Sequence, residues 1–211
     1  MALEKVNIYR IVHRENVAYI LEKGMFHINH PFFDPNNIFI GDTNLTEQRH
    51  EFPVPLAGYG NLGDYVPFYF GYRSPMLFNI STGYRSVTKR PQSDIIYIVC
   101  KLKCIDEKGL TYIFTDGHAK NYFTTFYTEA SDLTNLDWEN IDAMQWNNTP
   151  VDPDRMRRKQ AECLVKSQVP PQCIAALVVY DEVTKEEMEA LVKSLNLEIS
   201  VHVNPHGKFY Y

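Results

Sequence analysis

The chain has 211 residues, a hydrophobic content of 45% and a formal net charge of −5 at pH 7. This size suits one ordinary domain, and the composition excludes a disordered chain. The acidic balance argues against a generic nucleic-acid coat, because nonspecific binding needs lysines and arginines that displace counterions. No apolar stretch is long enough to span a membrane, and the first residues lack a signal peptide's apolar run. We expect one domain over residues 1–211, located in the cytoplasm.

The first segments predict a strand followed by a short helix. Residues 6–13 begin by alternating apolar and polar side chains and are rich in β-branched residues, which predicts a strand that ends at His13. Residues 16–23 carry apolar side chains at helical spacing. This helix stops at Gly24, a normal position for a left-handed cap.

The next segments predict an irregular region that leads into the core. Residues 27–65 are rich in Asn, Pro, Gly and His, with one possible helical turn at residues 45–49. Irregular stretches of this length are usually functional or disordered, and the apolar content here favours function. Residues 65–70 are too aromatic to be exposed throughout, and residues 71–75 turn the chain. We expect the core and a binding pocket to meet at this turn.

The middle of the chain predicts two buried strands and a long loop. Residues 95–102 are nearly continuous in β-branched side chains, as in a central strand, and residues 111–115 form a second strand that ends before His118. Residues 119–154 mix aromatic and polar side chains, which indicates a loop with helical pieces. Loops of this length often carry functional residues.

The last third predicts three strands and one amphipathic helix. The strands are expected at residues 161–165, 174–180 and 199–203, and the helix at residues 185–195. The order of elements lacks the regular strand–helix alternation of a doubly wound sheet. The fold class is therefore α+β.

The four cysteines predict neither a disulfide framework nor a metal site. Cys100, Cys104, Cys163 and Cys173 lie within apolar segments, which is typical of reduced thiols in a core. Cys100 and Cys104 have the wrong spacing for a zinc knuckle and are expected on one face of a strand. We therefore expect free thiols and no metal.

Glu162 is the most unusual residue in the sequence, because it is acidic and leads into an apolar strand. Burial of a lone carboxylate is costly unless its pKa moves or a ligand requires the charge. Just before it lies the densest cationic run, Arg155, Arg157, Arg158 and Lys159. Such a run is typical of a solvated helix face, with a basic groove as the alternative.

The sequence contains none of the common signatures for phosphate loops, dinucleotide folds, serine hydrolases or zinc proteases. What remains is a set of polar residues at the ends of strands or turns: His13, Arg49, Arg73, His118 and Glu162. A fixed carboxylate with cationic neighbours suits glycosyl transfer from NAD⁺, in which positive charge develops on a sugar and arginines bind the diphosphate. Taken singly, each histidine and arginine of this set has a structural role as its commoner explanation.

Sequence motifs add a resemblance that covers nearly the whole chain. They are YRIVH at 9–13, IGD at 40–42, LTEQR at 45–49, PVP at 53–55, DYVPFYFG at 64–71, RSPML at 73–77, FTDGHA at 114–119, RKQAE at 158–162 and VP at 169–170. In this order they resemble the DarT toxins of DarT–DarG toxin–antitoxin pairs. One departure is Val12, where the family often has Thr.

The resemblance implies an ADP-ribosyltransferase fold, in which a split mixed β-sheet with outer helices clamps NAD⁺ in a cleft. It implies a catalytic glutamate at Glu162, and Arg49 as a residue that supports catalysis and contacts the nucleotide. His13, Tyr69, Arg73 and Met76 would also bind NAD⁺, while His118, Tyr122, Arg155 and Arg158 would face DNA. Other aromatic side chains that could stack unpaired bases are Phe123, Phe126 and Trp146.

The resemblance also implies an acceptor and a partner. The acceptor would be a base, most often thymine, in a short single-stranded DNA sequence, and a DarG-like macrodomain antitoxin would remove the mark. No metal and no membrane contact are implied. Two alternatives stay open: an NAD⁺-dependent enzyme acting on RNA, similar to the RNA 2′-phosphotransferases, and a non-catalytic module that binds NAD⁺ or DNA and pairs Glu162 with Arg157 or Arg158.

Overall fold

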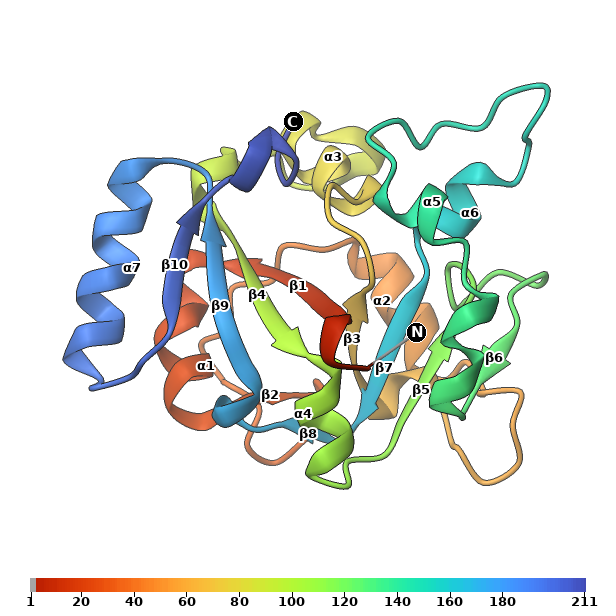
Figure 1. The fold of residues 1–211 in the computed structure, drawn as a ribbon, viewed down its shortest axis with the longest axis horizontal. Coiled ribbons are helices and arrows are strands. Elements are labelled where there is room, and N and C mark those ends of the chain that lie inside the picture. Colours follow the sequence, from red (N-terminus) through yellow and green to blue (C-terminus); the bar gives the residue numbers. More distant parts are fainter. Residues whose placement is uncertain (1–2) are drawn as a thin grey trace.

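The computed structural model describes residues 3–211, which fold around a mixed eight-stranded sheet (Figure 1). The strand order is β10-β9-β4-β1-β3-β7-β5-β6, and only the β9–β10 pairing in this sheet is parallel. The strands are β1 (Asn7–His13), β3 (Tyr65–Tyr69), β4 (Ile95–Lys101), β5 (Tyr112–Thr115), β6 (Phe126–Tyr127), β7 (Glu162–Lys166), β9 (Ile174–Val179) and β10 (Ser200–Val203). Two short strands, β2 (Met25–Phe26) and β8 (Gln168–Val169), form a separate pair.

The helices are short except for the last one. They are α1 (Val17–Lys23), α2 (Thr43–His50), α3 (Pro75–Thr82), α4 (Leu102–Glu107), α5 (Trp138–Asp142), α6 (Arg155–Lys159) and α7 (Glu182–Ser194). Helix α7 packs on β9 and β10 through Met188 and Val192, which are buried in the main core cluster. Figure 1 places α3, α5 and α6 together at the end of the sheet where β7 begins.

The centre of the sheet explains the most apolar stretch of the sequence. Strand β4 lies between β1 and β9, so both of its edges are hydrogen-bonded and both of its faces are covered. Every residue from Ile95 to Cys100 is buried. A strand enclosed in this way is expected to be a continuous run of β-branched side chains rather than an alternating one.

The pairing register brings polar residues from three strands into one row. Tyr9 of β1 pairs with Tyr69 of β3, and Tyr69 pairs with Glu162 of β7. Residues that pair directly across antiparallel strands have Cβ atoms about 5 Å apart. The row therefore places Tyr69 beside Glu162, although the two are far apart in the sequence.

The predicted strands and helices are present, with shifted boundaries. The last helix begins at Glu182 instead of 185, and strands β2, β3, β6 and β8 and helices α3 and α4 were not predicted. Gly24 follows α1 with φ 96° and ψ −174°, so its φ is positive as predicted but its ψ is not that of a left-handed helical cap. A Cβ at this position would lie 2.5 Å from the carbonyl oxygen of Val169, which explains why glycine is required there.

The prediction of four reduced cysteines was wrong for two of them. The chain leaves β4 and enters α4 at Leu102, so Cys104 lies on a helix and not on one strand face with Cys100. Cys104 forms a disulfide with Cys173, with Cα atoms 5.5 Å apart. Cys100 and Cys163 are free and buried, and burial raises the pKa of both thiols.

Among residues 3–211, no group of three or more His, Cys, Asp or Glu side chains is arranged to hold a metal ion. Within those residues, no helix has both the length and the apolar character that crossing a membrane requires.

Candidate active site

Glu162 is the first residue of β7, and its side chain is only 3% exposed. Its Oε1 accepts hydrogen bonds from Arg49 Nη1 at 3.1 Å and from the backbone N–H of Ala119 at 2.8 Å. Its Oε2 accepts from Arg49 Nη2 at 2.7 Å. Both carboxylate oxygens are therefore satisfied, and Arg49 binds them in the two-pronged geometry that suits a guanidinium.

The electrostatic balance at this pair keeps Glu162 ionised. Burial raises the pKa of Glu162, but the charge of Arg49 and the hydrogen bonds from Arg49 and the Ala119 N–H lower it by more, so that the net shift is downward. Burial lowers the pKa of Arg49, and Glu162 more than offsets this effect. The pair is thus a charged, buried ion pair, and loss of either partner would strand a charge in the interior.

Helix α2 delivers Arg49 to the carboxylate. Asp42 caps the helix by accepting a hydrogen bond from the backbone N–H of Leu45 at 2.9 Å, and Arg49 lies in the last turn. Every residue of α2 keeps some solvent exposure, so the helix is held without a buried apolar face. The ion pair with Glu162 is accordingly a main attachment of α2 to the sheet.

The loop after β5 supplies the backbone donor. Thr115 Oγ1 donates to the carbonyl of Gly117 at 2.6 Å and accepts from the backbone N–H of Glu162 at 3.1 Å. The backbone N–H of His118 donates to the carbonyl of Arg157 at 3.1 Å. A side chain on Gly117 would clash with Arg157. These contacts fix the turn that directs the Ala119 N–H at Glu162.

His118 lies at the edge of this site in neutral form. Its Nδ1 accepts from the backbone N–H of Lys120 at 3.3 Å, which leaves the proton on Nε2. Burial lowers its pKa, and the charges of Arg49, Lys120 and Arg85 lower it further, while Glu162 acts in the opposite direction. A neutral imidazole at pH 7 is available as a hydrogen-bond donor.

Tyr69 and Met76 form an adjoining wall. The Tyr69 hydroxyl donates to Met76 Sδ at 4.0 Å, and Met76 stands at the start of α3 after the Ser74 cap. Burial and the neighbouring Glu162 raise the pKa of Tyr69 well above its ordinary value, so the phenol stays protonated.

Arg73 lies in the turn before α3 and has an unusual backbone, with φ 53°. Its guanidinium stacks 4.5 Å from the centre of the Tyr211 ring, and its Nε is buried without a hydrogen-bond partner among the described residues. Because this N–H group is buried and unpaired, Arg73 retains a hydrogen-bond donor for a ligand.

His13 is farther along β1. It is 5% exposed, and its Nδ1 accepts from the backbone N–H of Glu15 at 3.3 Å. Burial lowers its pKa, and the charge of Arg90 adds to that effect. Because His13 is four residues beyond Tyr9 on the same strand, it lies about 13 Å from the Tyr9–Tyr69–Glu162 row at roughly 3.3 Å per residue.

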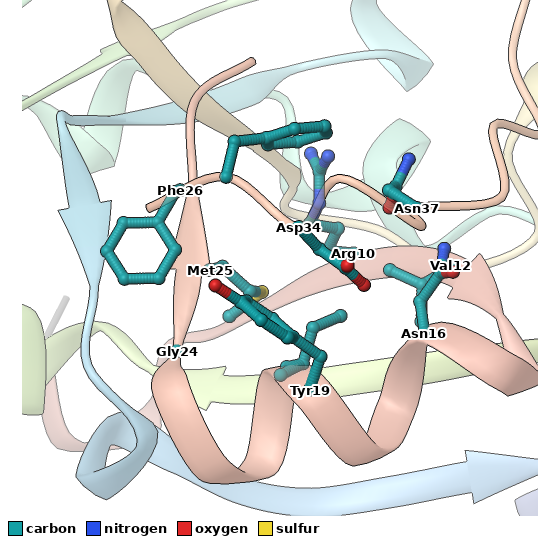
Figure 2. A pocket seen from close by; sticks show the side chains of 11 residues that line it. Arg10, Val12, Asn16, Tyr19, Gly24, Met25, Phe26, Asp34 and Asn37 are labelled. Atoms are coloured by element: carbon teal, nitrogen blue, oxygen red, sulfur yellow. The ribbon is translucent and has the colours of Figure 1, made fainter. Parts of the chain in front are cut away.

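Arg10 is a site residue that the sequence analysis did not select. It lines a cavity between β1, α1 and the loop that follows β2, together with Asn16, Asp34 and Asn37 (Figure 2). Its Nη1 donates to the carbonyl of Pro67 at 2.8 Å, and burial and the nearby Arg49 lower its pKa to about 10. The signal was an arginine between inward-facing apolar residues of a predicted strand.

The residues predicted to face DNA have different environments. Tyr122 is 94% exposed and contacts Phe123, which is 77% exposed. Arg155 donates to Asn140 Oδ1 at 3.4 Å. Arg158 forms ion pairs with three carboxylates: Asp137, Asp152 and Asp154. The Arg158 charge is already balanced, whereas the aromatic loop is open.

The cationic run of α6 is neither a solvated face nor a partner of Glu162. Arg157 pairs with Asp116 and Asp154, and its side chain is only 10% exposed. Lys159 is buried and donates to the carbonyls of Ile141 and Ala143, at 2.6 and 2.8 Å. The alternative in which Glu162 pairs with Arg157 or Arg158 was therefore wrong, because α6 is tied to neighbouring loops and Arg49 binds Glu162.

Trp146 and Phe126 are less available than the exposed aromatic pair. Trp146 Nε1 donates to the Tyr211 hydroxyl at 2.6 Å, and its ring packs against Phe78. Phe126 is partly buried in β6.

Comparisons with known proteins agree with this geometry. Residues 9–211 match the family model described as "ssDNA thymidine ADP-ribosyltransferase, DarT". A DNA ADP-ribosyl transferase of Escherichia coli O127:H6 is 36% identical over 199 residues, which cover 94% of this chain and 91% of the relative.

Solved structures of DarT proteins also resemble this chain. DarT of Thermus sp. 2.9 in complex with ADP-ribosylated ssDNA superposes with a TM-score of 0.87 at 31% identity, covering 99% of this chain and 97% of that one. The same protein with NAD⁺ gives a TM-score of 0.82 at 30% identity, covering 99% of this chain and 98% of that one. A DNA ADP-ribosyl transferase–DNA ADP-ribosyl glycohydrolase fusion protein of Thermosipho africanus is 26% identical over 196 residues, 91% of this chain and 47% of the fusion.

Proposed function

Because the chain belongs to the DarT family of DNA ADP-ribosyltransferases, we propose that it transfers ADP-ribose from NAD⁺ to a thymidine base of single-stranded DNA. The observation that best supports this chemistry is the buried, ionised Glu162 held by Arg49 and the Ala119 N–H. A fixed carboxylate stabilises positive charge that develops on a sugar when its leaving group departs. NAD⁺ provides such a sugar and leaving group.

The proposed NAD⁺ site runs from His13 along β1 to Tyr9 and then across the sheet to Glu162 of β7. A ligand that contacts both ends of this path must be elongated, as a dinucleotide is. Arg10 lies between the ends and lacks a carboxylate partner among residues 3–211, so it suits a diphosphate oxygen. Arg73, Tyr69 and Met76 would enclose the nicotinamide half.

In the proposed step, the bond between ribose C1′ and the nicotinamide nitrogen breaks, and its electron pair leaves with nicotinamide. Thymine has one ring N–H, and that nitrogen attacks C1′ while its proton moves to a carboxylate oxygen of Glu162. One glycosyl group and one proton are transferred, so we include no metal in the proposal. Positioning and charge stabilisation would supply most of the rate enhancement.

Arg49 must change partners for Glu162 to take a proton. With both oxygens bound by Arg49, Glu162 is a weak base, since its pKa is lowered. We propose that bound NAD⁺ draws one guanidinium nitrogen of Arg49 toward a phosphate or ribose oxygen and frees a carboxylate lone pair. The Ala119 N–H would keep the other oxygen in place.

The DNA strand would pass over the surface beside His118. Tyr122 and the adjacent Phe123 are exposed aromatic rings that can stack on unpaired bases. Arg155 would contribute a phosphate contact, and Arg158, bound by three carboxylates, would contribute less than the sequence suggested. Local stacking of this kind is compatible with the acidic net charge of the chain.

We also propose that the chain acts as the toxin of a toxin–antitoxin pair. The Thermosipho africanus relative joins a DNA ADP-ribosyl transferase to a DNA ADP-ribosyl glycohydrolase in one protein, which supports a partner that reverses the modification. A macrodomain of the DarG kind would supply this activity. Treating the modified DNA with such a macrodomain should remove the added mass, and a stable adduct would contradict this part of the proposal.

The acceptor can be identified by incubating the purified chain with NAD⁺ and matched single-stranded DNA and RNA oligonucleotides, followed by intact-mass analysis. Oligonucleotides that lack thymidine serve as the control. The proposal expects an added ADP-ribose on thymidine-containing DNA alone. Modification of RNA would favour the RNA-acting alternative, and NAD⁺ binding without any adduct would favour a non-catalytic module.

A further inference from the structure

The stretch that contains α3 and its following loop has an unusual charge. Residues 65–93 contain three arginines and one lysine but no aspartate or glutamate. The four cations are Arg73, Arg85, Lys89 and Arg90. In a chain with net charge −5, this stretch carries four positive charges and no negative one.

The backbone displays three residues of this stretch as an arm, which we define as Tyr84–Ser86. Helix α3 ends at Gly83 with φ 78°, and the next turn holds Arg85 and Ser86 at φ 56° and 61°. Val87 then returns to a core cluster and is only 8% exposed. With both ends of the arm fixed, its three side chains are held out in solvent.

A row of aromatic rings packs against the arm. Tyr84 is 57% exposed and meets Phe78 edge-on, with ring centres 6.4 Å apart. Phe78 in turn contacts Trp146 and Tyr211 at 5.7 and 5.5 Å. Tyr84 is therefore the open end of an aromatic row, which is a surface that can stack an unpaired base.

Arg85 is a cation without a carboxylate partner among residues 3–211. Its guanidinium lies 5.8 Å from the Tyr84 ring. Arg85 and Lys120 both lower the pKa of His118, which places their charges near the active site although they belong to separate segments. Together with Tyr122 and Phe123, they would line a path for a nucleic-acid strand past His118.

We infer that the Tyr84–Ser86 arm binds the nucleotide next to the modified thymidine, with Tyr84 stacking on its base and Arg85 contacting its phosphate. This inference rests on the proposed DNA transfer and adds the residues that read the flanking strand. A single strand is the required form, because bases in a duplex are stacked on one another and cannot reach Tyr84. The arm is distinct from the groups that hold NAD⁺, so it should affect DNA affinity alone.

The test compares Tyr84→Ala and Arg85→Gln with the unchanged chain on a single-stranded 20-mer that contains the reactive thymidine. For the 20-mer we expect Tyr84→Ala to raise KM about tenfold, with kcat and the Kd for NAD⁺ unchanged. Arg85→Gln should reduce the slope of log KM against log salt by about one. Tyr84→Phe keeps the ring and Arg85→Lys keeps the charge, so their KM and salt slope should stay close to those of the unchanged chain.

Lys193→Gln, on the outer helix α7, is a matched control for loss of one surface cation. Its KM and salt slope should equal those of the unchanged chain. Wild-type KM and slope in both arm variants, with active unchanged chain, would overturn this inference and leave the proposed function intact. Absence of any adduct from the unchanged chain would instead overturn the proposed function, and this inference with it.

Discussion

In helix α6, Arg157 and Arg158 are each bound by two or more carboxylates, whereas Arg10, Arg73 and Arg85 around the active site have none among residues 3–211. Arg157 and Arg158 are already neutralised and hold loops together. The arginines of the cleft and arm keep unbalanced charge and hydrogen-bond donors, which suits phosphate groups. On this basis we propose that paired arginines are structural in this chain and that the unpaired arginines of the cleft and arm bind ligands.

Arg49 is the informative exception, because it is paired and also lies at the proposed reacting centre. We expect Arg49→Lys to reduce transfer at least about 100-fold, since an ammonium cannot bind both carboxylate oxygens or shift one donor to the substrate. Single-turnover rates with saturating NAD⁺ and DNA would measure this. Near-normal turnover in Arg49→Lys would mean that a simple positive charge suffices.

Arg157→Leu tests the structural half of the comparison. Its ion pairs with Asp116 and Asp154 fix the loop that presents the Ala119 N–H, and its side chain is largely buried. We expect a loss of about 2 kcal/mol in the free energy of unfolding, measured with urea, because Asp116 loses its charged partner and Asp154 keeps only Arg158. Full stability with reduced NAD⁺ affinity would place Arg157 with the ligand-binding arginines instead.

Arg10→Gln tests the proposed ligand-binding role of the unpaired arginines. Arg10 has one hydrogen bond, to the carbonyl of Pro67, so its removal leaves no carboxylate unpaired. We expect the Kd for NAD⁺ to rise about tenfold, the loss typical of one charged hydrogen bond, with the unfolding midpoint little changed. Calorimetry and thermal unfolding on the same samples would separate the two effects. A large loss of stability with unchanged Kd would contradict the assignment.

Acid titration gives the smallest expected effect. The folded-state pKa of Glu162 is lowered from its ordinary 4.5, so its contribution to stability is complete above about pH 4.5 and is lost as pH falls below that value. Glu162→Gln should show a flatter loss of unfolding free energy over this acid range. An equal slope in both proteins would mean that the ion pair contributes nothing to folding.

Local patterns predicted much of the fold. Strand β4 and the strand that begins at Glu162 were predicted because buried strands are rich in apolar and β-branched residues, and that property is visible without tertiary contacts. The Cys104–Cys173 disulfide was missed because the two cysteines are 69 residues apart and meet only after α4 and the turn before β9 pack together.

The site was predicted in part for a similar reason. Glu162 was selected because an acidic residue in an apolar strand is a visible anomaly. Its partner could not be derived from spacing, since Arg49 is 113 residues away and arrives on the exposed helix α2. Arg10 was missed because a single arginine in an alternating strand is normally assigned to the face that meets solvent. In the sheet it turned out to line a cavity.

The most direct test of the account is a comparison of the unchanged chain with Glu162→Gln, with the exposed Glu186→Gln on α7 as control. NAD⁺ binding and the mass of a thymidine-containing single-stranded DNA would be measured for all three proteins. The account predicts that all three proteins bind NAD⁺ and that the unchanged chain and the control form an ADP-ribose adduct, whereas Glu162→Gln does not. An adduct formed by Glu162→Gln at a rate close to that of the unchanged chain would contradict the central role of this carboxylate.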